Sequence, residues 1–179
     1  MNLKKTLVAA MGAAILAAPL VAAPVLSSTA EAAGEQFFPL IIYRTGPYAV
    51  GGIPLANGYG DYLKLLNARD GGINGVKIKF EECETQYSTK VGVECYEKLK
   101  GKGDVGPTVF NPNSTGITYA IIPKASVDKV PVHSMGYGRT AAGDGRVFPW
   151  AFTFPTSYWS QAAAFINYVG EREGGKNNL

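Results

Sequence analysis

The stretch VFNPNSTGITYAII, residues 109–122, decides how this chain is expected to fold. Apolar residues run into Asn-Pro-Asn-Ser-Thr-Gly, and a pattern of helical period follows. Asn and Ser favour tight turns and the first position of a helix, where their side chains accept backbone hydrogen bonds. The stretch therefore predicts a strand, a turn and a helix in succession, which is the building unit of α/β folds.

The same alternation extends in both directions from this stretch. Short apolar or alternating runs predict strands at residues 37–43, 75–82, 104–110, 130–135 and 147–154. Helical spacing predicts helices around residues 55–66, at 88–100, at 114–129 and after Thr156, which is expected to cap the last one. We expect Pro123 to kink the third helix or split off its last turn, and Trp159 of the last helix to be a core residue. The order predicts an α/β fold with a parallel open sheet and helices on both faces.

The first 32 residues read as a secretory signal peptide. Lys4 and Lys5 precede a long apolar run, and an Ala-x-Ala site ends at Ala32. Removing 32 of the 179 residues leaves 147, enough for one domain at residues 33–179. The alternative is an uncleaved membrane anchor, although Gly12 and two prolines interrupt the run. The prediction implies a periplasmic location.

Charge and cysteine content narrow the class of protein. Without Lys4, Lys5 and Glu31, 15 basic and 13 acidic residues remain and form no run of one sign, so no nucleic-acid surface is expected. Cys83 and Cys95 are the only cysteines of a chain expected to be exported, which favours a disulfide over free buried thiols. With one histidine, the ligands are too few for a metal site, and no cofactor is expected.

The loops after the strands are the expected ligand site, because ligands of open α/β sheets bind at the carboxyl ends of the strands. Asn113, Ser114 and Thr115 open the third helix, where free N–H groups and the helix dipole attract an anion. The alternative reading is that Asn113 or Ser114 only caps the helix.

Other loop residues join this candidate site. Gly136, Tyr137, Gly138 and Arg139 follow the fourth strand, and the arginine suits a carboxylate. Tyr48 and Phe152 are the aromatic residues most expected to enclose an apolar part of a ligand. The alternatives are a solvated loop and core aromatics, respectively.

Enzymatic readings find little support in the sequence. His133, the sole histidine, has no nucleophile or carboxylate partner by motif and is interpreted as structural. The G-x-S-x-G, H-E-x-x-H and phosphate-binding loop motifs do not occur. We therefore expect a protein that is not an enzyme.

Four segments together resemble the branched-chain amino acid type of ABC transporter substrate-binding proteins. They are GPYAVGGIPLANGYGDYLKLLNARDGGINGVKIKF, VFNPNSTGITYAIIPKA, VPVHSMGYGRT and FPWAFTFPTSYW, in consistent order. The resemblance implies a type I periplasmic binding protein, in which two α/β lobes close over a small solute and deliver it to a membrane permease. By position, it places solute-gripping loops at residues 47–51, 113–115 and 136–138, whereas Arg139 rests on its charge alone.

The chain departs from the family in two ways. Family members are more than twice as long, so this chain resembles the N-terminal lobe with the second lobe absent. Its loops are also unusually rich in aromatic residues, which makes an aromatic or other apolar acid as plausible a solute as leucine or valine. We expect a monomer that binds such a carboxylate. The alternatives are a ligand-sensing domain of the same fold that acts with a signalling partner, and an exported hydrolase.

Overall fold

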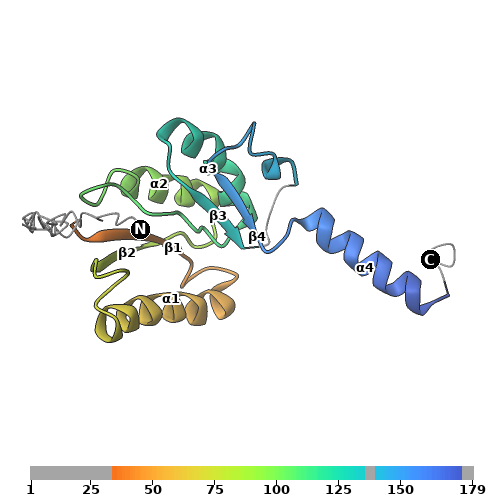
Figure 1. Ribbon diagram of the computed structural model, residues 1–179, viewed down its shortest axis with the longest axis horizontal. Helices are drawn as coiled ribbons and strands as arrows, with labels where there is room; N and C mark the ends of the chain where they lie inside the picture. Colours follow the sequence, from red (N-terminus) through yellow and green to blue (C-terminus); the bar gives the residue numbers. More distant parts are fainter. Residues whose placement is uncertain (1–33, 136–139, 175–179) are drawn as a thin grey trace, which may run out of the picture.

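The computed structural model of the protein describes residues 34–135 and 140–174. The elements in chain order are β1 (Gln36–Ile42), α1 (Ala49–Arg69), β2 (Ile78–Glu84), α2 (Thr89–Leu99), α3 (Thr115–Asp128), β3 (Val132–Met135), the short 3-10 helix η1 (Thr140–Gly143), β4 (Ala151–Phe154) and α4 (Tyr158–Arg172). Figure 1 shows them along the chain.

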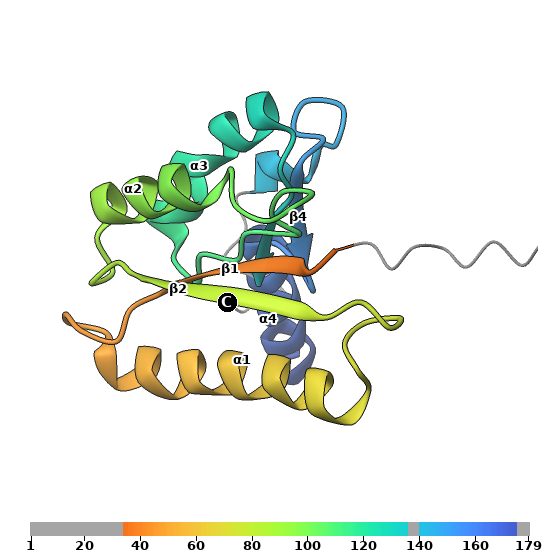
Figure 2. The same ribbon diagram turned by 90° about the vertical axis from the view of Figure 1, so that its left-hand side faces the viewer.

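The strands form two parallel ladders. β1 pairs with β2 from Gln36 opposite Ile78 to Ile42 opposite Glu84, and β3 pairs with β4 from Val132 opposite Ala151 onward. Helix α1 covers one face of β1 and β2, and α2 and α3 lie on the opposite side (Figures 1 and 2). This arrangement confirms the predicted α/β fold with parallel strands and helices on both faces.

The prediction of a strand at residues 104–110 is wrong. This segment makes only isolated bridges, from Pro107 to Phe37 and from Phe110 to Val132. Pro107 has no N–H to donate, and the backbone turns at Gly103 and Gly106, which both have positive φ angles. The segment nevertheless connects the two ladders, because the N–H of Thr108 donates to the carbonyl of Phe37 over 2.8 Å and that of Phe110 to Pro131 over 2.9 Å.

Two apolar clusters hold the layers together. One lies between β1, the 104–110 segment and helices α2 and α3, with Tyr96, Leu99, Phe110, Ile117 and Ile121 fully buried. The other lies beneath α1 and contains Leu40, Ile42, Ala56, Leu63 and Ile78. The predicted disulfide between Cys83 and Cys95 is present and ties β2 to α2.

Serine residues cap three of the helices. The hydroxyls of Ser88, Ser114 and Ser157 accept hydrogen bonds from the N–H three residues later. The expected cap at Thr156 is therefore wrong by one residue, because Ser157 has the extended backbone of an N-cap and Thr156 does not supply the bond. Helix α3 passes through Pro123 to Asp128, so its last turn is not split off.

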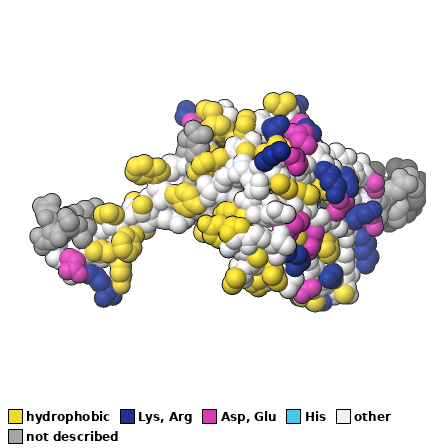
Figure 3. Space-filling model, turned by 180° about the vertical axis from the view of Figure 1, so that it is seen from behind, with side chains coloured by type: hydrophobic (Ala, Val, Ile, Leu, Met, Phe, Trp, Pro, Cys, Tyr) yellow, Lys and Arg dark blue, Asp and Glu magenta, His cyan; other side chains and the backbone are white. Residues whose placement is uncertain are grey.

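Helix α4 projects from the body (Figure 1) and carries apolar side chains into solvent (Figure 3). Trp159 is 75% exposed, so its interpretation as a core residue is wrong. The apolar stripe of α4 is present as predicted, but no other element among the described residues packs against it, so Trp159 faces solvent. Among these residues no helix has both the length and the apolar character needed to cross a membrane.

Candidate functional site

The candidate site lies at the carboxyl ends of the strands. β1 is followed by residues 43–48, β2 by residues 85–88, the bridging segment by residues 111–114, and β4 by residues 155–157. Because the strands run parallel and the bridging segment lies between β1 and β3, these loops share one edge of the molecule. Helices α1 and α4 both begin at this edge (Figure 1).

The turn before α3 presents free backbone donors. Asn113 has a left-handed φ of 51°, and Ser114 is 1% exposed and has extended backbone. The Ser114 hydroxyl accepts from the N–H of Ile117, and its carbonyl accepts from Thr118. Within the described part of the chain, the N–H groups of Thr115 and Gly116 have no hydrogen-bond partner, so they remain available to an anion. Ser114 thus caps the helix and leaves two donors free.

A polar network supports this turn from the side of α1. The Tyr59 hydroxyl donates to Asn113 Oδ1 over 3.2 Å and accepts from Asn111 Nδ2 over 2.9 Å. Asn111 Nδ2 also lies 3.4 Å from Nδ1 of His133, whose ring faces Phe154. The Oδ1 atom of Asn111 is buried and has no partner among the described residues. The role of Tyr59 is not visible in the sequence, because its helical spacing indicates only a place on the buried stripe of α1.

The loop after β4 meets the start of α3. Thr115 Oγ1 lies 2.6 Å from the hydroxyl of Tyr158, the first residue of α4. Thr140 Oγ1 donates to Ser157 Oγ over 3.2 Å in the same region. This contact places hydroxyl groups of α3 and α4 beside the free N–H groups, and Tyr158 is a site residue that the sequence motifs did not single out.

The remaining expected residues are placed as follows. Tyr48 is 57% exposed and packs on Tyr87, with 4.3 Å between ring centroids. Phe152 is 52% exposed and lies opposite His133 in the β3–β4 ladder. The structure describes no contact between either ring and Ser114. Gly136, Tyr137, Gly138 and Arg139 lie outside the described residues.

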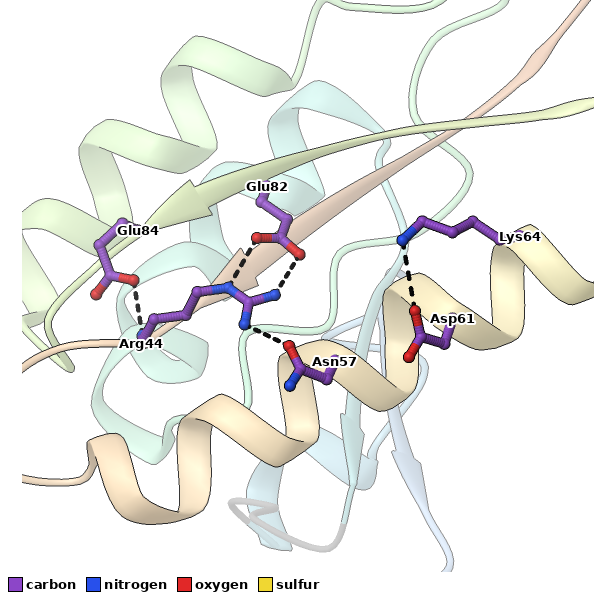
Figure 4. Close-up of polar contacts among 6 residues, drawn as sticks. All are labelled: Arg44, Asn57, Asp61, Lys64, Glu82 and Glu84. Atoms are coloured by element: carbon purple, nitrogen blue, oxygen red, sulfur yellow. Dashed lines mark hydrogen bonds and ion pairs between the residues drawn. The ribbon is translucent and has the colours of Figure 1, made fainter.

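An ion pair fixes the loop after β1. The guanidinium of Arg44 donates to both oxygens of Glu82 over 2.9 and 2.7 Å and to Asn57 Oδ1 over 2.6 Å. It therefore joins this loop to β2 and α1 (Figure 4). The same view shows the pair of Asp61 and Lys64, which lies on the exposed surface of α1.

Glu84 joins the loops after β1 and β2. Its carboxylate accepts from the N–H of Arg44 over 2.7 Å and from that of Gln86 over 2.8 Å, and also from the Thr45 hydroxyl. Burial acts to raise the pKa of Glu84, but these hydrogen bonds outweigh it and lower the pKa below its ordinary value of 4.5. The carboxylate is therefore charged at neutral pH and holds the two loops together.

The site presents groups that can contact a ligand. Backbone N–H groups, hydroxyls, amides and aromatic rings gather at this edge, and the described residues contain no cluster of His, Cys, Asp or Glu side chains fit to hold a metal ion. In the part of the chain that the structure describes, His133 contacts the Asn111 amide and the Phe154 ring, and no carboxylate orients it. These groups suit an anionic solute with an apolar part.

Comparison with known proteins identifies the family of the chain. The sequence pattern of the family described as periplasmic binding protein matches residues 35–178. The chain belongs to this family of solute-binding proteins, as its resemblance implied. A search of the curated proteins gave no match.

Solved structures show the same fold. The chain is 45% identical to a protein described as an ABC transporter permease from the Pseudomonas fluorescens group, with a TM-score of 0.73 over 79% of this chain and 34% of that one. A branched-chain amino acid ABC transporter protein from Thermus thermophilus with bound valine is 22% identical, with a TM-score of 0.65 over 78% of this chain and 36% of that one. An ABC transporter substrate-binding protein from Aeropyrum pernix is 18% identical, with a TM-score of 0.62 over 78% of this chain and 36% of that one. The chain thus spans about a third of the length of these proteins.

Proposed function

We propose that the chain forms the first lobe of a solute-binding protein that delivers a small carboxylate-bearing solute to the permease of an ABC importer. It binds the solute without chemical turnover and acts as a monomer. The solute is a branched-chain amino acid or an aromatic or other apolar acid, held between this lobe and a second one. Family membership supports the class of function, and the site supports the chemistry of the solute.

The observation that carries the proposal is the start of α3. Two N–H groups, of Thr115 and Gly116, are free there within the described residues, and the cap of Ser114 holds the helix end in shape. The positive end of the helix dipole adds attraction for a carboxylate. Hydroxyls of Thr115 and Tyr158 border the position.

A proline at Thr115 tests this role. Thr115 is the first residue of α3, where proline is tolerated, and Ser114 before it has the extended backbone that a following proline requires. Thr115→Pro therefore removes one N–H while sparing the helix. We expect the affinity for a carboxylate solute to fall about tenfold, as for the loss of one hydrogen bond to a charged group. Isothermal titration of the purified protein with leucine, valine, phenylalanine and phenylacetate measures it.

The control is Thr115→Ala, which removes the hydroxyl but keeps the N–H. Affinity should then stay within about threefold of the unchanged protein, since one neutral hydrogen bond contributes little net free energy. Equal affinities of the proline and alanine variants would contradict a carboxylate at this helix end.

We further propose that the chain is exported to the periplasm and cleaved after Ala32. The apolar run and the Ala-x-Ala site support this. The mass of the protein released from the periplasm of an expressing Gram-negative cell should correspond to a chain that begins at Ala33. A full-length mass in the membrane fraction would refute cleavage.

A further inference from the structure

Three tyrosines are in ring-to-ring contact at the carboxyl edge of β1 and β2, one pair edge to face and one pair tilted, and we name this group the tyrosine stack. Tyr43 follows β1 and is buried, Tyr87 follows β2 and is half-buried, and Tyr48 precedes α1 and is 57% exposed. The rings of Tyr43 and Tyr87 meet edge to face with centroids 4.9 Å apart, and those of Tyr87 and Tyr48 are 4.3 Å apart. This tyrosine stack runs from the core to the surface and ends in an open aromatic ring.

The backbone that carries Tyr87 is held in a rare conformation. Gln86 and Tyr87 are consecutive residues with left-handed φ angles of 53° and 61°. Side chains other than Gly, Asn and Asp seldom adopt this region, and such strain persists only where neighbouring contacts enforce it. Here the N–H of Gln86 donates to Glu84, and the N–H of Tyr87 donates to the hydroxyl of fully buried Thr85 over 3.2 Å. These hydrogen bonds hold the strained backbone in place, and this backbone conformation fixes where the Tyr87 ring lies.

The inner end of the stack is fixed equally closely. A Cβ atom at Gly52 would overlap the carbonyl oxygen and the ring of Tyr43, so α1 approaches this ring only because residue 52 is a glycine. Arg44, the residue after Tyr43, is anchored to Glu82 and Asn57. Tyr43 is thus held against α1, Tyr87 contacts Tyr43, and the exposed ring of Tyr48 contacts Tyr87.

The stack lies on the same edge as the start of α3. The 104–110 segment is bridged directly to β1, so the loop of Tyr48 and the turn of Ser114 follow neighbouring segments. The free N–H groups of Thr115 and Gly116 and the exposed ring of Tyr48 therefore belong to the same edge of the molecule. A ring held in this way stabilises a bound aromatic group more than an aliphatic one, because aromatic pairs gain free energy beyond that of apolar burial.

We infer that the tyrosine stack selects a solute with a planar aromatic group over an aliphatic one, and that Tyr87 is the positioning residue that gives Tyr48 this preference. The inference rests on the proposed function and specifies its solute class. Tyr48 touches the solute, and Tyr87 acts through Tyr48. Loss of the Tyr87 ring leaves Tyr48 unsupported and removes the preference for flat solutes without removing the carboxylate site.

Pairs of acids that share a carboxylate measure this preference. Titrations of the protein with phenylacetate and isovalerate, and with phenylalanine and leucine, give a ratio of dissociation constants for each pair. In the unchanged protein we expect at least one aromatic member to bind about tenfold more tightly than its aliphatic partner. Tyr87→Leu should reduce that ratio about three- to tenfold, the range of one stacked aromatic contact.

Two matched variants distinguish the effect of losing the Tyr87 ring from a general loss of stability caused by substituting a tyrosine. Tyr87→Phe keeps the ring and should keep the ratio. Tyr62→Leu removes a tyrosine on α1 that is also 57% exposed and is no part of the stack, and should keep it too. If Tyr87→Leu does not fold, Tyr48→Leu in its place should give the same loss of ratio.

The outcomes distinguish the inference from the proposed function. Binding with equal affinity for aromatic and aliphatic members, or a Tyr87→Leu variant with an unchanged ratio, overturns the inference and leaves the proposed function standing. An absence of binding by all four acids overturns both, because both place the carboxylate on N–H groups that this lobe itself supplies. If Tyr87→Phe lowers the ratio as much as Tyr87→Leu does, the inference is also overturned, because loss of the ring would then not be the cause.

Discussion

Glu84 shows how one side chain can organise two loops. Its carboxylate receives hydrogen bonds from residues after β1 and after β2, and both loops support the tyrosine stack. Glu84 and Glu82 stand two positions apart in β2 and both meet Arg44, through its N–H and its guanidinium respectively. The sequence shows this spacing but gives no sign that an arginine 38 residues away completes it.

This network predicts sensitivity to acid. Because the pKa of Glu84 is lowered in the folded protein, its charge stabilises the fold above the unfolded pKa, and that contribution is lost as the pH falls through the folded pKa. Glu84→Gln should lower the free energy of unfolding at pH 7 by about 1–2 kcal/mol. Its melting temperature should then decline less steeply than that of the unchanged protein between about pH 5 and pH 3.

Thermal unfolding followed by circular dichroism at several pH values measures both effects. Asp61→Asn is the matched control, because Asp61 is an exposed carboxylate that forms an ion pair with Lys64 and no described hydrogen bond with Arg44 or Glu84. An acid profile of Glu84→Gln parallel to that of the unchanged protein would show that other carboxylates dominate the acid response.

Among the helices, α4 differs most from the others. Helices α2 and α3 pack on each other and on the sheet, whereas α4 exposes Trp159, Phe165, Ile166 and Tyr168. An isolated helix of 15 residues is marginally stable in water, since most helical stability comes from tertiary packing. The cap of Ser157 and the stacking of Arg172 on Tyr168 are local contacts that replace little of it.

We therefore expect the backbone N–H groups of α4 to exchange with solvent at least about a hundredfold faster than those of α2. Hydrogen–deuterium exchange of the full chain, read by mass spectrometry of peptides, compares the two helices in one sample. Helix α2 is a suitable reference because it is shorter, with 11 residues, and is fixed by the disulfide at Cys95. Equal protection of α4 and α2 would mean that α4 has a packing partner in solution.

Across the whole molecule, the order of elements was predictable and the contacts between them were not. Alternating apolar runs and serine caps are local signals, so the strands β1, β2, β3 and β4 and the start of α3 at Ser114 followed from the sequence. The segment at residues 104–110 reads as a strand because it is mostly apolar, yet Pro107 and the turns at Gly103 and Gly106 limit it to single bridges. Whether a helix stripe such as that of α4 is covered depends on neighbours that periodicity does not identify.

The candidate site follows the same division. The turn of Asn113, Ser114 and Thr115 was identifiable, because its residue types favour a helix start. The links from Tyr59 to Asn113 and from Thr115 to Tyr158 span 54 and 43 residues, and no local pattern encodes them. The tyrosine stack likewise joins two loops that lie about 40 residues apart in the sequence, the loop after β1 and the loop after β2, so only the folded chain reveals it.

The exposure of Trp159 affects the tryptophan fluorescence of the protein. The chain has two tryptophans, of which Trp159 on α4 is 75% exposed and Trp150 in the body is half-buried. A water-exposed indole emits at longer wavelengths than a shielded one, so the two residues contribute separate components to the fluorescence spectrum. Any partner or segment that covers α4 would shift the long-wavelength component toward the blue, while the emission of Trp150 would report on the segment that leads into β4.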